Sequence, residues 1–237
     1  MKKTLLITLI MFVCLTMGVS AALITTYDYV TGAYTTGDTN LTFKLSNVDL
    51  LSGKTATIVS GGYHTATIPA DDAGRSATLT DGTFASSGLT VIAGDYDTLS
   101  TASLVLEYDL STTYSISSIR IFAAHDGDGS RAFINCDVEV DKGSGYSILA
   151  SKAKTGAYGL AKGAAVSSGL YIADNAGALS TGVKKIKITF FKVSHNSNGN
   201  FADPFVLPYP NQGTVLKEID VFGAVSSEVN DWNMMAK

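Results

Sequence analysis

The sequence has few cysteines, few prolines and few charged residues. Its 237 residues include two Cys and four Pro, and charged side chains make up 16% of the chain. Cys14 lies in an amino-terminal segment that we expect to be removed, which would leave Cys136 alone and exclude an intrachain disulfide. Exported domains of modest size often depend on disulfides, but about 200 residues are enough to bury a core without one.

Basic clusters and catalytic motifs are also scarce. The formal net charge is −4, and the densest basic stretch, Lys184 to Lys187, lies in an alternating strand pattern that indicates a solvated sheet face. Neutralising phosphates needs clustered Lys and Arg, so we expect no nucleic acid partner. His64, His125 and His195 show no His-Glu-x-x-His spacing, and no Gly-x-Ser-x-Gly motif is present. We therefore expect a protein that is not an enzyme.

The first residues have the pattern of a signal peptide. Lys2 and Lys3 form a charged start, Leu5 to Val13 is mostly apolar, and Val19-Ser20-Ala21 supplies the small residues that signal peptidase accepts. The apolar run is shorter than the roughly 20 residues of a membrane anchor. We expect residues 1–21 to be removed and no membrane span to remain. The mature chain would then be secreted, periplasmic or held at the cell surface.

Apolar and polar residues alternate in several segments, which predicts short strands with one buried face. The clearest pattern runs from Ile134 to Val140 and places Cys136 on the buried face, as an inert small hydrophobe rather than a reactive thiol. Ala153 to Ala176 is rich in Ala and Gly and is expected to hold at most a short turn of helix. Further strands are predicted at Leu104–Leu110, Ile119–Ala123, Ile148–Ser151, Val183–Lys192 and Val215–Phe222. The fold class is therefore all-β, and a sandwich is the architecture that this pattern favours.

Three segments lie outside these strands. Residues 22–46 are expected to form an amino-terminal strand segment, and residues 224–237 a carboxy-terminal tail. Residues 194–213 contain three of the four prolines together with bulky side chains such as Phe201. Long loops within compact domains are often functional. This loop either contributes to a binding site or caps the end of the sandwich with its aromatic side chains.

Five stretches of the sequence occur in an order that is specific when they are taken together. They are Ala77-Thr78-Leu79-Thr80-Asp81-Gly82, Leu106 to Leu110 continuing to Ile121, Ser130-Arg131 followed by Cys136 to Val140, Val183 to Ile188, and Leu216 to Gly223. Through them the sequence resembles the discoidin family, also called the coagulation-factor type C domains. The resemblance implies a jelly-roll β-sandwich of the galactose-binding-like type over residues 47–223. The bacterial branch of carbohydrate-binding modules is the closer comparison, because the disulfide of the eukaryotic branch is absent.

The resemblance also implies a structural calcium ion between Asp81, in the Asp-Gly loop, and Glu218, on the last predicted strand. Calcium prefers six to eight oxygen ligands, which two carboxylates and loop carbonyls would supply. The alternative is that Asp81 caps a turn and that Glu218 lies on a solvated strand face.

A ligand site is less well indicated by the resemblance. His125 stands near the position of the arginine that sugar-binding relatives use, and Arg131 follows a few residues later, either in the site or as the structural arginine of the next strand. The candidate ligand-binding residues are His125, Arg131, Tyr63, His64 and Phe201. Together with the signal peptide and the resemblance, these residues predict an exported, non-catalytic module. It would recognise a surface glycan through loops at one end of the sandwich. The alternative is a structural or adhesive surface protein that acts through protein contacts.

Overall fold

The structure is a computed structural model that describes residues 22–31, 41–63, 71–84, 91–92, 103–125, 132–155, 165–191, 194–195, 201–202 and 214–225. The predicted signal peptide and residues 226–237 lie outside these ranges. The strands are β1 (Leu23–Thr31), β2 (Thr57–Ser60), β3 (Val91–Ile92), β4 (Ser103–His125), β5 (Asn135–Asp141), β6 (Tyr146–Lys154), β7 (Val166–Asp174), β8 (Ser180–Phe191), β9 (Ser194–His195), β10 (Phe201–Ala202) and β11 (Val215–Val225). One short helix, α1 (Asp72–Ala77), is present in the described part of the chain.

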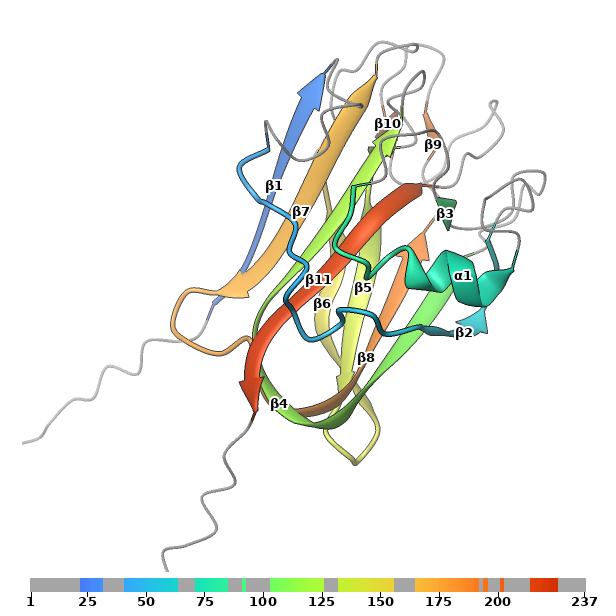
Figure 1. The fold of residues 1–237 in the computed structure, drawn as a ribbon. Helices are drawn as coiled ribbons and strands as arrows, with labels where there is room; N and C mark the ends of the chain where they lie inside the picture. Colours follow the sequence, from blue (N-terminus) through green and yellow to red (C-terminus); the bar gives the residue numbers. More distant parts are fainter. Residues whose placement is uncertain are drawn as a thin grey trace, which may run out of the picture.

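The strands form two layers that share β4, as Figure 1 shows. The first half of β4 pairs with β2 and β8, and β8 continues to β5 and β6; we call this the β8 layer. The second half of β4 pairs with β7 and β11, and β7 pairs with β1; we call this the β7 layer. Between the two halves Ser111 has a φ of 69°, where the strand changes layer. The strand pairs of both layers are antiparallel in the part of the chain that the structure describes, and the fold is an all-β jelly-roll sandwich, as predicted.

The core lies between the two layers. The predicted alternation is confirmed over β5, where Cys136, Val138 and Val140 are buried. Cys136 is fully buried, which confirms its predicted position on the buried face, and burial raises the pKa of its thiol. From the β7 layer, Ile119 and Ile121 of β4 join the same apolar cluster.

An extended segment, residues 41–50, covers the outer face of the β7 layer. The Phe43 ring stacks on Tyr171 of β7 at 5.0 Å between ring centres. Arg120 of β4 donates a hydrogen bond of 2.7 Å to the Lys44 carbonyl and lies 4.4 Å from the ring centre of Phe222. Both faces of this layer are therefore buried over part of their area, which explains why consecutive residues of β4 are buried from Ile121 to Ala124.

The outer face of the β8 layer carries charged side chains, as predicted for the segment Lys184 to Lys187. Lys185 pairs with Glu107 at 2.8 Å, and Lys187 pairs with Glu139 at 2.9 Å. The Tyr146 hydroxyl donates to Glu107 at 2.5 Å. This face is a solvated network of opposite charges.

Within the region from Ala153 to Ala176, the structure differs from the prediction over Val166–Asp174, which form strand β7. Gly169 lies within this strand, and a Cβ there would contact the rings of Phe122 and Phe43 at 3.5 Å. The strand is buried on both faces and so lacks the polar alternation by which half-buried strands are recognised. At the amino terminus, β1 pairs with β7, and residues 41–46 are not in a strand. Among the described residues, no helix is long and apolar enough to cross a membrane.

Candidate metal centre and ligand-binding end

The loop after α1 is fixed against the last strand. The Ile219 N–H of β11 donates a hydrogen bond of 2.7 Å to the Leu79 carbonyl, and Leu79 is fully buried. Gly82 has a φ of +73°, and a Cβ at this position would lie 2.4 Å from the Cβ of Asn47. Only glycine fits so close an approach. The hydrogen bond to Leu79 and the close contact of Gly82 with Asn47 therefore fix the position of the Asp-Gly loop beside Glu218.

Glu218 occupies an unusual position for a carboxylic acid. A register shift between Leu216 and Glu218 interrupts the pairing of β11 with β4, and Glu218 lies opposite Phe122. Its side chain is fully buried, and neither carboxylate oxygen has a hydrogen-bond partner within the described part of the chain. The alternative that Glu218 lies on a solvated strand face is therefore wrong.

The environment of Glu218 raises its pKa to about 9. Burial is the largest cause, and the nearby negative charges of Asp220, Asp81 and Asp49 add to it. The backbone N–H of Gly82 opposes the shift, although it falls outside hydrogen-bonding geometry. Asp81 and Glu218, which the sequence pairs as metal ligands, are therefore brought together by the fold.

The other carboxylates of this centre are engaged within the chain. Asp81 Oδ1 accepts hydrogen bonds from the Thr83 N–H at 2.8 Å and the Thr83 hydroxyl at 2.6 Å, so Asp81 does cap a turn. Asp49 Oδ1 accepts from the Leu51 and Val221 backbone N–H groups. Asp220 Oδ2 accepts from the Ser46 N–H at 2.9 Å. Asp49 and Asp220 could not be predicted from the sequence, because their proximity to Glu218 depends on how residues 41–50 cross β11.

Whether these residues suit a cation can be judged from their chemistry. An orphaned, fully buried carboxylate among three other carboxylates offers hard oxygen atoms of the kind that calcium binds. The described residues contain no group of three or more His, Cys, Asp or Glu side chains arranged to hold a metal ion. A cation at Glu218 would therefore need backbone carbonyls or water to complete its ligands. The residues fit calcium on that condition.

The predicted ligand-binding residues lie in different parts of the structure. His125 is the last residue of β4, is partly buried, and lies opposite Val166 at the start of β7. Tyr63 is 7% exposed, and its hydroxyl lies 2.9 Å from the Ser76 hydroxyl inside the protein. Phe201 begins β10 opposite His195. Arg131 and His64 lie outside the described residues.

His125 stands at one definite end of the sandwich. β4 ends there, β7 begins there and β1 ends there, since Thr31 and His125 both align with Val166 of β7. Tight turns occupy the opposite end: Gly143 and Gly145, between β5 and β6, both have a positive φ. We call the first the His125 end and the second the turn end.

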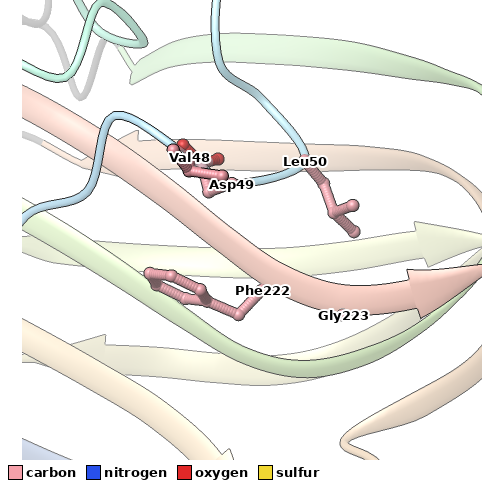
Figure 2. Close-up of a pocket in the computed structure, with 5 residues that line it drawn as sticks. All are labelled: Val48, Asp49, Leu50, Phe222 and Gly223. Atoms are coloured by element: carbon pink, nitrogen blue, oxygen red, sulfur yellow. The ribbon is translucent and has the colours of Figure 1, made fainter.

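A separate depression lies on the outer face of the β7 layer. Val48, Asp49 and Leu50 line it from the segment before β2, and Phe222 and Gly223 line it from β11 (Figure 2). Its volume is about 210 Å³. The Asp49 carboxylate already accepts hydrogen bonds from Leu51, Val221 and Ser52, so the depression offers mainly apolar contacts.

Comparisons with known proteins find similar structures but no sequence family. No protein-family model and no curated protein matches the chain. The carboxy-terminal domain of a chitobiase from Bacteroides fragilis is 16% identical, with 77% of this chain and 99% of that one covered and a TM-score of 0.43. Chitosan-binding module 1 of a chitosanase/glucanase from Paenibacillus sp. IK-5 is 14% identical, with 74% and 99% covered and a TM-score of 0.39. A CBM32 module of Clostridium perfringens is 13% identical, with 75% and 100% covered and a TM-score of 0.39.

One of these structures is a CBM32 module, and another is a chitosan-binding module. Identities and TM-scores this low carry no inference about what the present chain binds.

Proposed function

We propose that this chain is an exported, non-catalytic carbohydrate-binding module that binds glycan at the His125 end of the sandwich. The ordered resemblance of five stretches to the discoidin family supports this function. The structural observation that carries it is the position of His125, which closes β4 at the end opposite the tight turns. A neutral imidazole has one nitrogen that donates and one that accepts, which are the groups needed to bond sugar hydroxyls.

Arg131 belongs to this proposal as the second polar contact, because it follows His125 closely in the sequence. Phe201 would supply an aromatic ring on which the apolar face of a sugar stacks. Tyr63 is not part of the proposed contact surface, since its ring is in the core and its hydroxyl meets Ser76.

A structural calcium ion completes the proposal. Asp81 and Glu218 would bind the ion. Its positive charge would also lie near the carboxylates of Asp49 and Asp220. Such an ion links the Asp-Gly loop to β11 and relieves the repulsion among these carboxylates. Its role here is in folding and loop position, with no part in a reaction.

Glu218 itself is not a candidate catalytic acid in this proposal. A glutamic acid with a raised pKa is the group that glycosidases use as a general acid. Glu218 is fully buried, so a substrate would not reach its carboxyl group. Its raised pKa is better explained by burial among like charges than by catalytic tuning.

Binding to a broad panel of immobilised glycans, followed by calorimetry on any glycan that is retained, tests the function. Retention of at least one glycan and a clear loss of affinity in His125→Ala are expected. Lys184→Ala is the matched control, because Lys184 is exposed and lies beside Gly143 at the turn end. No retention on any glycan, or equal losses in both variants, would contradict the proposal.

Export is tested separately, by fractionating cells that express the full chain. The protein should be recovered outside the cytoplasm with Ala22 as its first residue. Recovery in the cytoplasm with Met1 retained would refute export and leave the glycan proposal to its own test.

A further inference from the structure

The depression on the outer face of the β7 layer has no part in the glycan proposal. Val48, which lines it, is 79% exposed and is the most exposed large hydrophobic side chain in the part of the chain that the structure describes. Leu50 and Phe222 are partly buried and complete the apolar lining. Single exposed apolar side chains are common on proteins, but a group of them around a hollow marks a contact surface.

The walls of this depression are fixed to each other. The Leu50 N–H donates a hydrogen bond of 2.8 Å to the Val221 carbonyl, and the Val221 N–H donates one of 3.1 Å to Asp49 Oδ1. The segment that forms one wall is thus bonded to the strand that forms the other, as Figure 2 shows. A hollow that is formed in advance costs less to fill than one that the occupant must order.

The size and polarity of the depression limit what can occupy it. Its volume of about 210 Å³ is below the roughly 300 Å³ at which pockets for small-molecule ligands begin, so it fits one large side chain. Asp49 is its one charged group, and three described hydrogen bonds use three of the roughly four acceptor sites of that carboxylate. An apolar ring with a single N–H donor matches this lining, and the indole of tryptophan is such a group.

The chain carries one tryptophan, Trp232, and it lies in the tail that follows β11. Met234 and Met235 beside it make this part of the tail apolar. Val225 ends β11 only three positions after Phe222, a distance of about 10 Å along the strand. Trp232 follows seven positions after Val225, and seven residues span up to roughly 23 Å. The tail is therefore long enough to turn back to the depression.

We propose that the carboxy-terminal tail folds back over the end of β11 and that the Trp232 indole fills this depression on the same chain. The ring packs against Val48, Leu50 and Phe222, and the indole N–H donates to the Asp49 carboxylate. Tryptophan contributes a large apolar area when it is buried, and its N–H then needs a partner. The depression supplies both.

The direction of β11 decides what a docked tail would cover. Leu216 lies opposite Ala123 of β4, near the His125 end, and Val225 lies opposite Tyr114, near the turn end. The tail therefore leaves the sandwich at the turn end, and docking keeps the His125 end open. The proposal does not rest on the glycan function, and it adds a contact across the place where residues 41–50 cross β11.

A fluorescent label in the depression tests the contact directly. In a chain with Cys14→Ser, Cys136 is the one native cysteine left and is fully buried, so bimane attached at Val48→Cys marks the depression. Tryptophan quenches bimane on contact, so Trp232→Phe should raise the emission of this label several-fold. Val59→Cys is the matched control, because Val59 is exposed on β2 in the other layer, and emission there should not respond to Trp232→Phe.

Selective excitation of Trp232 gives a second readout on the unlabelled full chain. Its emission should be shifted to the blue relative to the urea-unfolded chain. Val48→Glu should reverse that shift, because it places a charge in the apolar wall, and Val59→Glu should not. Equal emission of the label at position 48 before and after Trp232→Phe would overturn the proposal. Quenching that disappears on dilution would also overturn it, because the tryptophan would then come from a second copy.

Discussion

Asp81, in the loop after α1, lies close enough to Glu218, on the last strand, for its charge to raise the pKa of the Glu218 carboxyl group. Asp220 and Asp49 act in the same direction, and burial acts more strongly than any of them. A buried carboxyl group among carboxylates must hold either a proton or a cation. The stability of this part of the fold should therefore depend on the pH and on the concentration of a cation that binds there.

Calcium should raise the melting temperature of the protein, and Glu218→Gln should abolish that rise. The reason is that a divalent cation binds the folded chain and has no preformed site in the unfolded chain. Thermal unfolding in calcium, in magnesium and in a chelator measures the effect. Glu139→Gln, on the solvated face of the β8 layer, is the control and should keep the calcium response. Equal melting temperatures with calcium and with chelator would contradict the metal centre.

In chelator, stability should fall as the pH rises from about 4.5 to about 9. The Glu218 pKa is about 9 in the folded chain against 4.5 for an ordinary glutamic acid. Within this window the unfolded chain has released the proton that the folded chain retains, so the free energy of unfolding decreases with pH. The slope from one such group is at most about 1.4 kcal/mol per pH unit. Urea unfolding of the wild type and of Glu218→Gln measures it, and parallel pH profiles for the two proteins would show that Glu218 does not titrate this way.

The sequence predicts those strands that expose one face to water. Over β5 the alternation of Cys136, Val138 and Val140 with polar neighbours survives in the structure, because the other side of that strand carries the solvated charge network. Strand β7 was missed because it is buried on both faces. The segment around Phe43 packs against the outer face of this strand. Because that segment is distant in the sequence, the residues of β7 alone do not indicate that its outer face is buried.

The candidate metal centre shows the same limit. The Asp-Gly loop and Glu218 could be paired through the family resemblance, and the fold does bring them together. Asp49 and Asp220 could not be assigned to this centre from the sequence. Asp49 contacts β11 by accepting a hydrogen bond from the Val221 N–H, and these two residues are 172 positions apart. The burial of Glu218 also depends on the register shift beside it, which side-chain periodicity does not reveal.

Gly223→Ala should destabilise the fold strongly, whereas Gly62→Ala should not. A Cβ at Gly223 would lie 2.3 Å from the Ser115 carbonyl oxygen and 3.1 Å from Leu50 Cδ1. Because β11 pairs with β4 at this point, the backbone must move to admit the methyl group, at a cost of about 1–3 kcal/mol. At Gly62 a Cβ would meet nothing within 4 Å, so a change below about 0.5 kcal/mol is expected. Chemical unfolding of both variants measures the difference, and similar losses would show that the close approach at Gly223 is not a constraint.

The contact between Glu107 and Tyr146 should stabilise the β8 layer above pH 5 and lose its effect in acid. The Lys185 ammonium, followed by the Tyr146 hydroxyl, holds the pKa of Glu107 below its ordinary value. A carboxylate whose pKa is lowered by folding adds stability above its unfolded pKa, and this stability is lost as the pH falls through the folded pKa. Glu107→Gln should therefore cost about 1 kcal/mol at pH 7 and almost nothing at pH 3, since partly exposed charges are screened by water.

A double-mutant cycle separates the hydrogen bond from the ion pair. Tyr146→Phe removes only the hydroxyl that donates to Glu107 at 2.5 Å, so its cost should shrink when Glu107 is already Gln or protonated, because a neutral acceptor forms a weaker hydrogen bond than a carboxylate. Glu139→Gln serves for comparison, because Glu139 pairs with Lys187 at 2.9 Å on the same face. The stability cost of Glu139→Gln should be the same in the wild type and in Tyr146→Phe. Lys187 lies 4.0 Å from the centre of the Tyr146 ring, so a change in that cost would measure coupling between the Lys187–Glu139 and Tyr146–Glu107 contacts. Urea unfolding at both pH values measures these couplings. Additive costs for Glu107→Gln and Tyr146→Phe at pH 7 would mean that the hydroxyl contributes nothing through Glu107.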